Sequence, residues 1–211
     1  MWYRVSDSST GTNIVSISPW KPLRGRSLNV LRVPAFYQPE QEPECVIYSL
    51  YSVLQYLENG YPDKEIRRRT DTMPVDEIKD YLTIGRGGWR LDQYDELVEL
   101  AEQISTVEFD LYHAENPAGD LGNLIAGQLA DTLPLIIWID GNLLRYGEEG
   151  SGVLHSIVVI GQTDTEVAVI DPYWKLEDTI DKENLEAVWD AAYNIAIVPR
   201  ISESTRNGGN P

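Results

Sequence analysis

The chain has 211 residues, of which 42% are hydrophobic, so it is long enough to bury the core of one globular domain. Lysine and arginine total 17 against 34 aspartates and glutamates, and the resulting net charge of −17 disfavours binding to nucleic acids and anionic membranes. The acid excess, with more arginine than lysine, is typical of proteins adapted to high salt, and an ordinary acidic protein is the alternative.

A single cysteine cannot form an internal disulfide, and two histidines with one thiol hardly supply a zinc site. We therefore expect no metal and no other cofactor. The N-terminus lacks the basic start and apolar core of a signal peptide, and the longest apolar run, residues 133–139, is too short to cross a bilayer. The sequence thus predicts a cytoplasmic protein without a membrane span, and it leaves the oligomeric state open.

The N-terminal part of the chain leads to the only cysteine. Residues 1–29 alternate Ser, Thr and Gly clusters with short apolar pieces, which predicts an extension with a strand or two and loops, and residues 29–34 predict a strand. A loop with two prolines follows. Cys45 then heads a helix to about Leu57, with Leu50, Val53, Leu54 and Leu57 on one buried face and Gly60 predicted as a left-handed cap.

The position of the thiol favours reactivity. In the first turn of a helix, sulfur faces unpaired N–H groups and the positive end of the helix dipole, and both stabilise the thiolate. A lone cysteine without a base is nevertheless more often a small buried hydrophobe. A partner imidazole is therefore needed before Cys45 can be assigned a role.

The middle of the chain alternates helices and strands. The patterns predict short helices at residues 63–70 and 74–81, a glycine-rich loop at 84–89 and a helix from Asp92 to about residue 103. Further along they predict a half-buried strand at 106–112, a helix at 120–131, a fully buried strand at 133–140 and a loop at 141–152.

Two strands near the C-terminus place an imidazole and a carboxylate together. Residues 154–160 and 166–170 are apolar runs joined by a short turn, which predicts an antiparallel hairpin. His155 enters this hairpin and Asp171 leaves it, so both lie near the same end of adjacent strands. A helix at 182–192, a strand at 194–198 and a disordered polar tail at 201–211 complete the prediction.

A cysteine peptidase needs a thiol, an imidazole that accepts its proton, and an Asp or Asn that orients the imidazole. Cys45, His155 and Asp171 can fill these roles if the helix packs on the sheet. His113 is a rival imidazole, but it stands between a strand and a turn and we expect it at the surface. Asp140 is a rival orienter, and the Asp-Gly-Asn sequence there favours a turn.

Three segments carry a family resemblance: residues 33–38 with Cys45 and its helix, the run from His155 to Gly161, and residues 167–172 with the helix that holds Trp189. In this order they resemble the papain-like superfamily, and most closely the C39-type double-glycine leader peptidases of bacteriocin exporters and their stand-alone relatives. The resemblance implies an α+β papain-like domain over residues 30–200, in which the cysteine-bearing helix packs on an antiparallel sheet.

The resemblance also implies roles for individual residues. Cys45 would be the nucleophile, His155 the general base and Asp171 its orienter. An oxyanion donor glutamine lies about six residues before the cysteine in the family, whereas Gln38 lies seven and Gln41 four residues before it. We favour Gln38, with the Cys45 backbone N–H as second donor. Val46 stands where many relatives have glycine.

Two functions follow from these residues. The first is a thiol peptidase that cleaves peptide or protein substrates, whose site could also run amide transfer or deamidation. The alternative is a catalytically inactive domain that binds an extended peptide or a partner protein. Glu40, Glu42 and Glu44 favour the alternative, because carboxylates near a thiol raise its pKa.

Two further features bear on the family relationship. The chain has no ATP-binding motif, so the sequence does not predict the peptidase portion of a fused export transporter. Residues 207–210 resemble a double-glycine cleavage site, but glycine pairs are common in polar tails and we do not expect self-processing.

Overall fold

A computed structural model describes residues 21–22, 30–39, 44–82, 94–105, 107–113, 120–147 and 154–201. In this part of the chain, seven strands form one antiparallel sheet in the order β1-β6-β5-β4-β3-β7-β2. The strands are β1 Lys21–Pro22, β2 Glu108–His113, β3 Leu135–Asp140, β4 Leu154–Gln162, β5 Glu166–Asp171, β6 Leu176–Asp181 and β7 Ile195–Arg200. The helices are α1 Cys45–Asn59, α2 Lys64–Arg69, α3 Val75–Leu82, α4 Tyr94–Ile104, α5 Asp120–Ala130, α6 Gly141–Tyr146 and α7 Lys182–Asp190.

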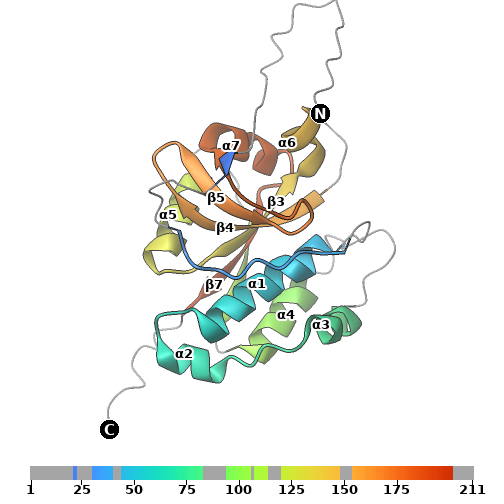
Figure 1. Ribbon diagram of the computed structural model, residues 1–211, viewed down its shortest axis with the longest axis vertical. Helices are drawn as coiled ribbons and strands as arrows, with labels where there is room; N and C mark the ends of the chain where they lie inside the picture. Colours follow the sequence, from blue (N-terminus) through green and yellow to red (C-terminus); the bar gives the residue numbers. More distant parts are fainter. Residues whose placement is uncertain are drawn as a thin grey trace, which may run out of the picture.

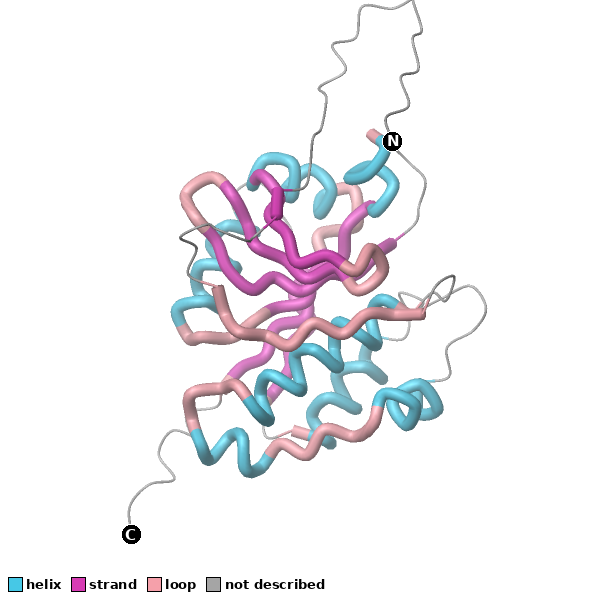
Figure 2. Tube along the Cα trace, viewed as in Figure 1, coloured by secondary structure: helices cyan, strands magenta, loops and turns pink. Residues whose placement is uncertain are grey.

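The sheet lies between two layers of helices, with α1 to α4 on one face and α5 to α7 on the other (Figures 1 and 2). Successive strand residues point to opposite faces, so each central strand feeds two cores. On β3, for example, Trp138 joins the core under α1, whereas Ile137 joins the core under α7. The predicted packing of the cysteine-bearing helix on an antiparallel sheet is therefore correct.

Helix α1 forms where the sequence predicts it, and its apolar face is fully buried. Leu50, Val53, Leu54 and Leu57 all have zero exposure and contribute to the core between α1 and the sheet. The predicted cap is wrong. Gly60 has φ −109° and a right-handed conformation, and its N–H donates to the Tyr56 carbonyl. The helix therefore ends without a left-handed residue at Gly60.

The structure differs from the sequence prediction in three other segments. The segment 141–152 begins with helix α6, which Asp140 caps by accepting hydrogen bonds from the backbone N–H groups of Asn142 (3.0 Å) and Leu143 (2.9 Å). The predicted strand at 29–34 is reduced to one bridge between Val30 and Gly161. Strand β6, which pairs with β5, was not predicted. Its sequence is rich in acidic residues and lacks the apolar run or alternation that indicates a strand.

The predicted hairpin is present as β4 and β5, and it contains an irregularity that anchors the segment leading to Cys45. The register shifts between Val159 and Gly161. At this bulge the Leu31 N–H donates to the Ile160 carbonyl at 2.8 Å, next to the Val30 bridge. A bulge frees backbone groups from the regular ladder, and here they bind the chain that runs on to α1.

Several predictions lie outside the described residues, including Asp92, the glycine-rich loop at 84–89, residues 1–20 and the tail 202–211. The domain boundaries at residues 29 and 200 stay predictions. Strand β1, which falls in the predicted extension, pairs with β6 at one edge of the sheet. Every helix in the described ranges is too short or too polar to cross a lipid bilayer.

Trp189 of α7 connects helix and sheet in the second core. Its side chain has zero exposure, and its indole N–H donates to the Ile195 carbonyl at 2.9 Å. Replacing Trp189 by Phe removes this donor and leaves a cavity, so we expect the free energy of unfolding to fall by about 2–4 kcal/mol in urea titration. The control Tyr146→Phe, at a side chain 61% exposed, should change it by less than about 0.5 kcal/mol. An unchanged W189F midpoint would contradict the prediction.

Candidate active site

The candidate nucleophile begins helix α1 and is partly exposed. Glu44 precedes it at the N-cap, and its carbonyl accepts from the backbone N–H groups of Ile47 (3.0 Å) and Tyr48 (3.3 Å). The Cys45 thiol thus lies at the positive end of a 15-residue helix, as the sequence predicts.

His155 and Asp171 meet at the end of the β4–β5 hairpin. The His155 Nε2–H donates to Asp171 Oδ1 at 2.9 Å, with His155 7% exposed and Asp171 fully buried. Because the carboxylate occupies Nε2, the ring presents Nδ1 toward the remaining partner. That partner is Cys45, with which His155 shares a hydrogen bond. The three residues predicted from sequence therefore come together in the structure.

The turn after β5 fixes the Asp171 carboxylate. Its Oδ1 also accepts from the backbone N–H groups of Tyr173 and Trp174, both at 2.9 Å. A carboxylate that binds the two following N–H groups in this way sets the direction of the turn and locks its own rotamer. The ring of Tyr173 then lies edge-on to His155, with 6.1 Å between ring centroids.

Ser156, the residue after His155, is a site residue that the sequence analysis missed. Its hydroxyl and its backbone N–H both donate hydrogen bonds to the Cys45 sulfur. Ser49, one helical turn after Cys45, approaches the Ser156 hydroxyl at 3.2 Å and donates toward its carbonyl at 3.4 Å. The only signal in the sequence was the adjacency of Ser156 to His155.

These contacts change the ionisation of the site in opposite directions. Desolvation alone would raise the pKa of Cys45, but the hydrogen bond and charge of His155, followed by the two Ser156 hydrogen bonds, lower it below its ordinary value of 9.0. Desolvation would likewise lower the pKa of His155, but Asp171, and then Cys45, raise it from 6.5 to about 10. Both shifts favour the ionised forms, thiolate and imidazolium.

Gln38, the predicted oxyanion donor, is 2% exposed, and its backbone N–H donates to the Pro172 carbonyl at 3.0 Å. The segment leading to it is also tied to α1, because the Phe36 N–H donates to the Ser52 hydroxyl at 3.3 Å. The backbone around Gln38 is thus fixed between the middle of α1 and the turn that follows Asp171. Gln41, together with Glu40 and Glu42, lies outside the described residues.

Glu44, the described member of the acidic loop, forms an ion pair. Its Oε2 lies 2.6 Å from the Lys79 Nζ of α3, with both side chains largely buried, and Lys79 also lies over the Tyr48 ring at 5.4 Å from the centroid. The negative charge next to Cys45 is therefore compensated. Lys79 is a second residue that the sequence analysis did not connect with the site.

The rival residues are placed elsewhere. His113 is exposed at the end of β2, the outermost strand on the far side of β3 and β7. Asp140 caps α6, as described above. Helix α6 instead supports the candidate base, because a Cβ at Gly141 would lie only 3.1 Å from the His155 Cβ. Glycine thus permits the close approach of α6 behind His155.

A family model for the Peptidase_C39 like family matches residues 30–197. The chain belongs to this family. A comparison with curated proteins finds no match. The matched range contains all four predicted site residues, Gln38, Cys45, His155 and Asp171, and Val46 of this C39-like protein is fully buried in the core below the thiol.

Solved structures show the same papain-like fold. A protein described as a C39-like peptidase from Bacillus anthracis matches with TM-score 0.58 and 17% identity over 82% of this chain and 98% of the other. The peptidase domain of Streptococcus ComA, a bifunctional ABC transporter of a quorum-sensing pathway, gives TM-score 0.53, 15% identity and coverage of 79% and 97%. A double-glycine-motif protease from an AMS/PCAT transporter, in complex with the leader peptide, matches with TM-score 0.52 and 19% identity over 87% of this chain and 99% of the other.

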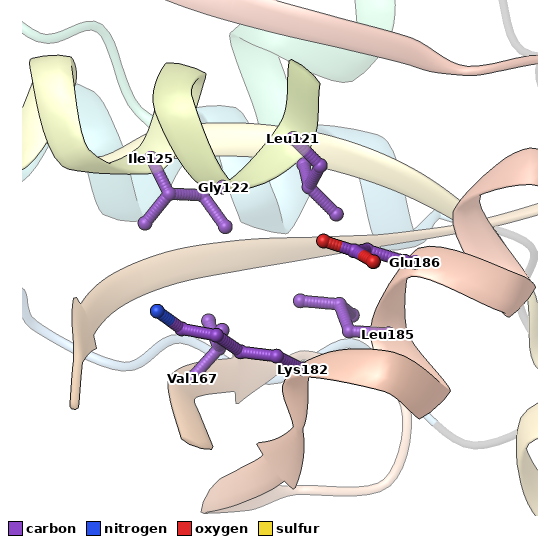
Figure 3. Close-up of a pocket in the computed structure, with 7 residues that line it drawn as sticks. All are labelled: Leu121, Gly122, Ile125, Val167, Lys182, Leu185 and Glu186. Atoms are coloured by element: carbon purple, nitrogen blue, oxygen red, sulfur yellow. The ribbon is translucent and has the colours of Figure 1, made fainter. Parts of the chain in front are cut away.

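A small hollow on the opposite face of the sheet holds none of these residues. It lies between α5, β5 and α7, where Lys182 and Glu186 run along an otherwise aliphatic lining (Figure 3). The lining is Leu121, Gly122, Ile125, Val167, Lys182, Leu185 and Glu186. Within the described ranges, no three His, Cys, Asp or Glu side chains are grouped to hold a metal ion.

Asp171→Asn tests the electrostatic part of the site. The amide keeps the size of the side chain but removes the charge that raises the pKa of His155, so the pKa of His155 should fall and the pKa of Cys45 should rise. The pH profile of iodoacetamide alkylation should move to higher pH, with the rate at pH 7 lower by about tenfold or more. The matched control Asp164→Asn, in the exposed turn of the same hairpin, should leave the profile in place. Overlapping D171N and wild-type profiles would contradict this prediction.

Lys79→Met tests the compensation of Glu44. Without the ammonium group, the Glu44 carboxylate acts more strongly on the neighbouring thiolate, so the pKa of Cys45 should rise and alkylation at pH 7 should slow by roughly two- to tenfold. The double variant with Glu44→Gln should recover the wild-type rate, because the offending charge is gone. A double variant as slow as K79M would show that Lys79 acts through packing on Tyr48 instead.

Proposed function

We propose that this C39-like protein is a cysteine peptidase in which Cys45 is the nucleophile, His155 the general base and acid, and Asp171 the residue that orients and charges His155. One observation carries the proposal: the buried His155 ring binds Asp171 Oδ1 through Nε2 at 2.9 Å and interacts with the thiol at the head of α1 on its other side. Strongly shifted pKa values with a specific charge partner cluster at functional sites, which supports this assignment.

The reaction follows from these positions. The Cys45 thiolate attacks the substrate's carbonyl carbon, forming a C–S bond while the π electrons move to the carbonyl oxygen. Collapse of this intermediate breaks the C–N bond, and the His155 imidazolium gives its proton to the leaving amine. Water then attacks the thioester, His155 accepts its proton, and the thiolate leaves, which regenerates the resting pair.

Gln38 is proposed as a side-chain donor to the carbonyl oxygen, together with the Cys45 backbone N–H. Its support is the anchoring of its backbone between α1 and the turn after Asp171. Removing one such donor typically lowers kcat by about 100-fold or more.

The substrate is proposed to be an extended peptide segment of a peptide or protein. The double-glycine-motif protease with the related fold holds a leader peptide. In this chain, Tyr173 is 41% exposed beside His155 and offers an aromatic surface next to the reacting bond. The acidic character of the chain favours substrates with basic residues outside the cleaved bond.

The test is cleavage of an unfolded protein, such as casein, and of a mixture of extended peptides, with new N-termini detected by mass spectrometry. Wild type should cleave, Cys45→Ala should be inactive, and His155→Ala should lose at least about a thousandfold in kcat/KM. His113→Ala, at an exposed histidine on the far strand, is the matched control and should retain full activity.

The same experiment separates the peptidase from a catalytically inactive binding domain. If wild type and Cys45→Ala bind peptides equally and neither produces new termini, the binding function stands and the peptidase is wrong. The lowered pKa of Cys45 favours the peptidase, because a binding domain gains nothing from an ionised thiol.

A further inference from the structure

Tyr94, the first residue of α4, carries a buried hydroxyl that the fold does not explain. The side chain is 5% exposed, and its hydroxyl oxygen makes no hydrogen bond to any of the described residues. Buried polar atoms in folded proteins are nearly always paired, and an unpaired one lowers stability. Phenylalanine would fill the same space without that cost. The hydroxyl is therefore best explained by a hydrogen-bond acceptor that a bound molecule supplies.

The ring of Tyr94 packs on a sheet residue whose cross-strand neighbour lies next to the candidate nucleophile. It packs edge-on against Trp138 of β3, with 4.9 Å between centroids and an interplanar angle of 88°. Trp138 is paired across the sheet with Ser156 of β4, which donates to the Cys45 sulfur. Tyr94 and the core residues of α1 also belong to one apolar cluster. Tyr94 therefore lies on the same side of the sheet as the thiol.

The environment of Tyr94 keeps its hydroxyl protonated. Burial, and then the negative charge of Cys45, raise the pKa of Tyr94 well above its ordinary value of 10.0. At neutral pH the group is therefore a hydrogen-bond donor and not a base. The coupling to Cys45 also means that negative charge in the site is felt at this oxygen.

The acceptor is not the sulfur in its resting state. The sulfur interacts with His155 and Ser156, and Tyr94 is not among its hydrogen-bond partners. The charge of Cys45 raises the pKa of the Tyr94 hydroxyl, but the two groups share no hydrogen bond. An atom that would lie beside the sulfur only during reaction is the carbonyl oxygen of a substrate, which is attached to the carbon that the sulfur attacks.

We propose that the Tyr94 hydroxyl is a further catalytic hydrogen-bond donor, which binds the substrate's carbonyl oxygen as the Cys45 sulfur adds to the carbonyl carbon. The proposal rests on the peptidase function given above. As the C–S bond forms, the π electrons move onto oxygen, and Tyr94 stabilises that charge without giving up its proton. It would act together with Gln38 and the Cys45 backbone N–H.

Tyr94→Phe tests the proposal through two reactions of the same thiol. Acylation by p-nitrophenyl acetate passes through an oxyanion and releases p-nitrophenolate, whereas alkylation by iodoacetamide forms a C–S bond and releases iodide without one. In Y94F we expect acylation to slow by about 10- to 100-fold and alkylation to stay within about twofold of wild type. The thermal unfolding midpoint should stay the same or rise, because an unpaired buried hydroxyl is removed.

Tyr56→Phe is the matched control. Tyr56 is also buried, but its hydroxyl donates to the Thr132 carbonyl at 2.9 Å, toward the other end of α1. This variant should lose stability and keep both reaction rates. Comparing Tyr94→Phe with Tyr56→Phe thus separates the loss of an unpaired hydroxyl coupled to Cys45 from the loss of a paired hydroxyl in the core.

Each remaining outcome decides the proposal. Equal acylation of Y94F and wild type overturns the role of Tyr94 and leaves the peptidase function standing. A parallel fall in acylation and alkylation also overturns it, because the hydroxyl would then act on the thiolate or on packing. If wild type is alkylated but never acylated, the peptidase function fails, and the Tyr94 role fails with it.

Discussion

The buried carboxylate of Asp171 is the constraint on which the candidate site depends. Its exposure is zero, and a buried charge is costly unless hydrogen bonds and a counter-charge surround it. Two backbone N–H groups of the following turn and the His155 ring supply these, all at 2.9 Å from Oδ1. The geometry of the turn, the rotamer of His155 and the protonation of its ring are consequences of pairing this one oxygen, whereas the buried Oδ2 has no hydrogen-bond partner among the described residues. Through His155, the same charge reaches the thiol.

The acidity of the chain acts against this arrangement, and short-range contacts overcome it. A net charge of −17 opposes a further negative charge on sulfur, but exposed charges are screened within about 8–10 Å in ordinary salt. The groups that touch the sulfur are a cation and two neutral donors, from His155 and Ser156. Glu44, the residue directly before Cys45 in the chain, forms an ion pair with Lys79. Local pairing, and not the overall charge, thus sets the state of the thiol.

The sequence predicts those parts of the site that depend on short stretches of chain. The helix after Cys45 follows from its apolar period, and the meeting of His155 with Asp171 follows from a hairpin whose two ends they occupy. The role of Gln38 comes from the family resemblance and stays a prediction. These inferences need only one helix, one hairpin and the packing of one on the other.

The sequence could not predict residues that reach the site across long distances in the chain. Lys79 contacts Glu44 from α3, and Tyr94 of α4 packs on Trp138 of β3; neither contact leaves a pattern in the sequence. Helix α6 was taken for a loop because its glycine and short length resemble a turn, although Gly141 allows α6 to approach His155 closely. The salt adaptation and cytoplasmic location predicted from composition stay predictions.

The division of the site between two layers makes its reactivity a property of the whole fold. The thiol belongs to a helix and the imidazole to the sheet, so their separation is set by the packing of α1 on β4. The Ser49–Ser156 contact joins these layers directly below the thiol. The segment before Cys45 is bonded to both layers, at the β4 bulge and at Ser52 of α1. A shift of either layer would therefore displace Cys45, His155 and Gln38 relative to one another, so the geometry of the candidate site depends on the complete core.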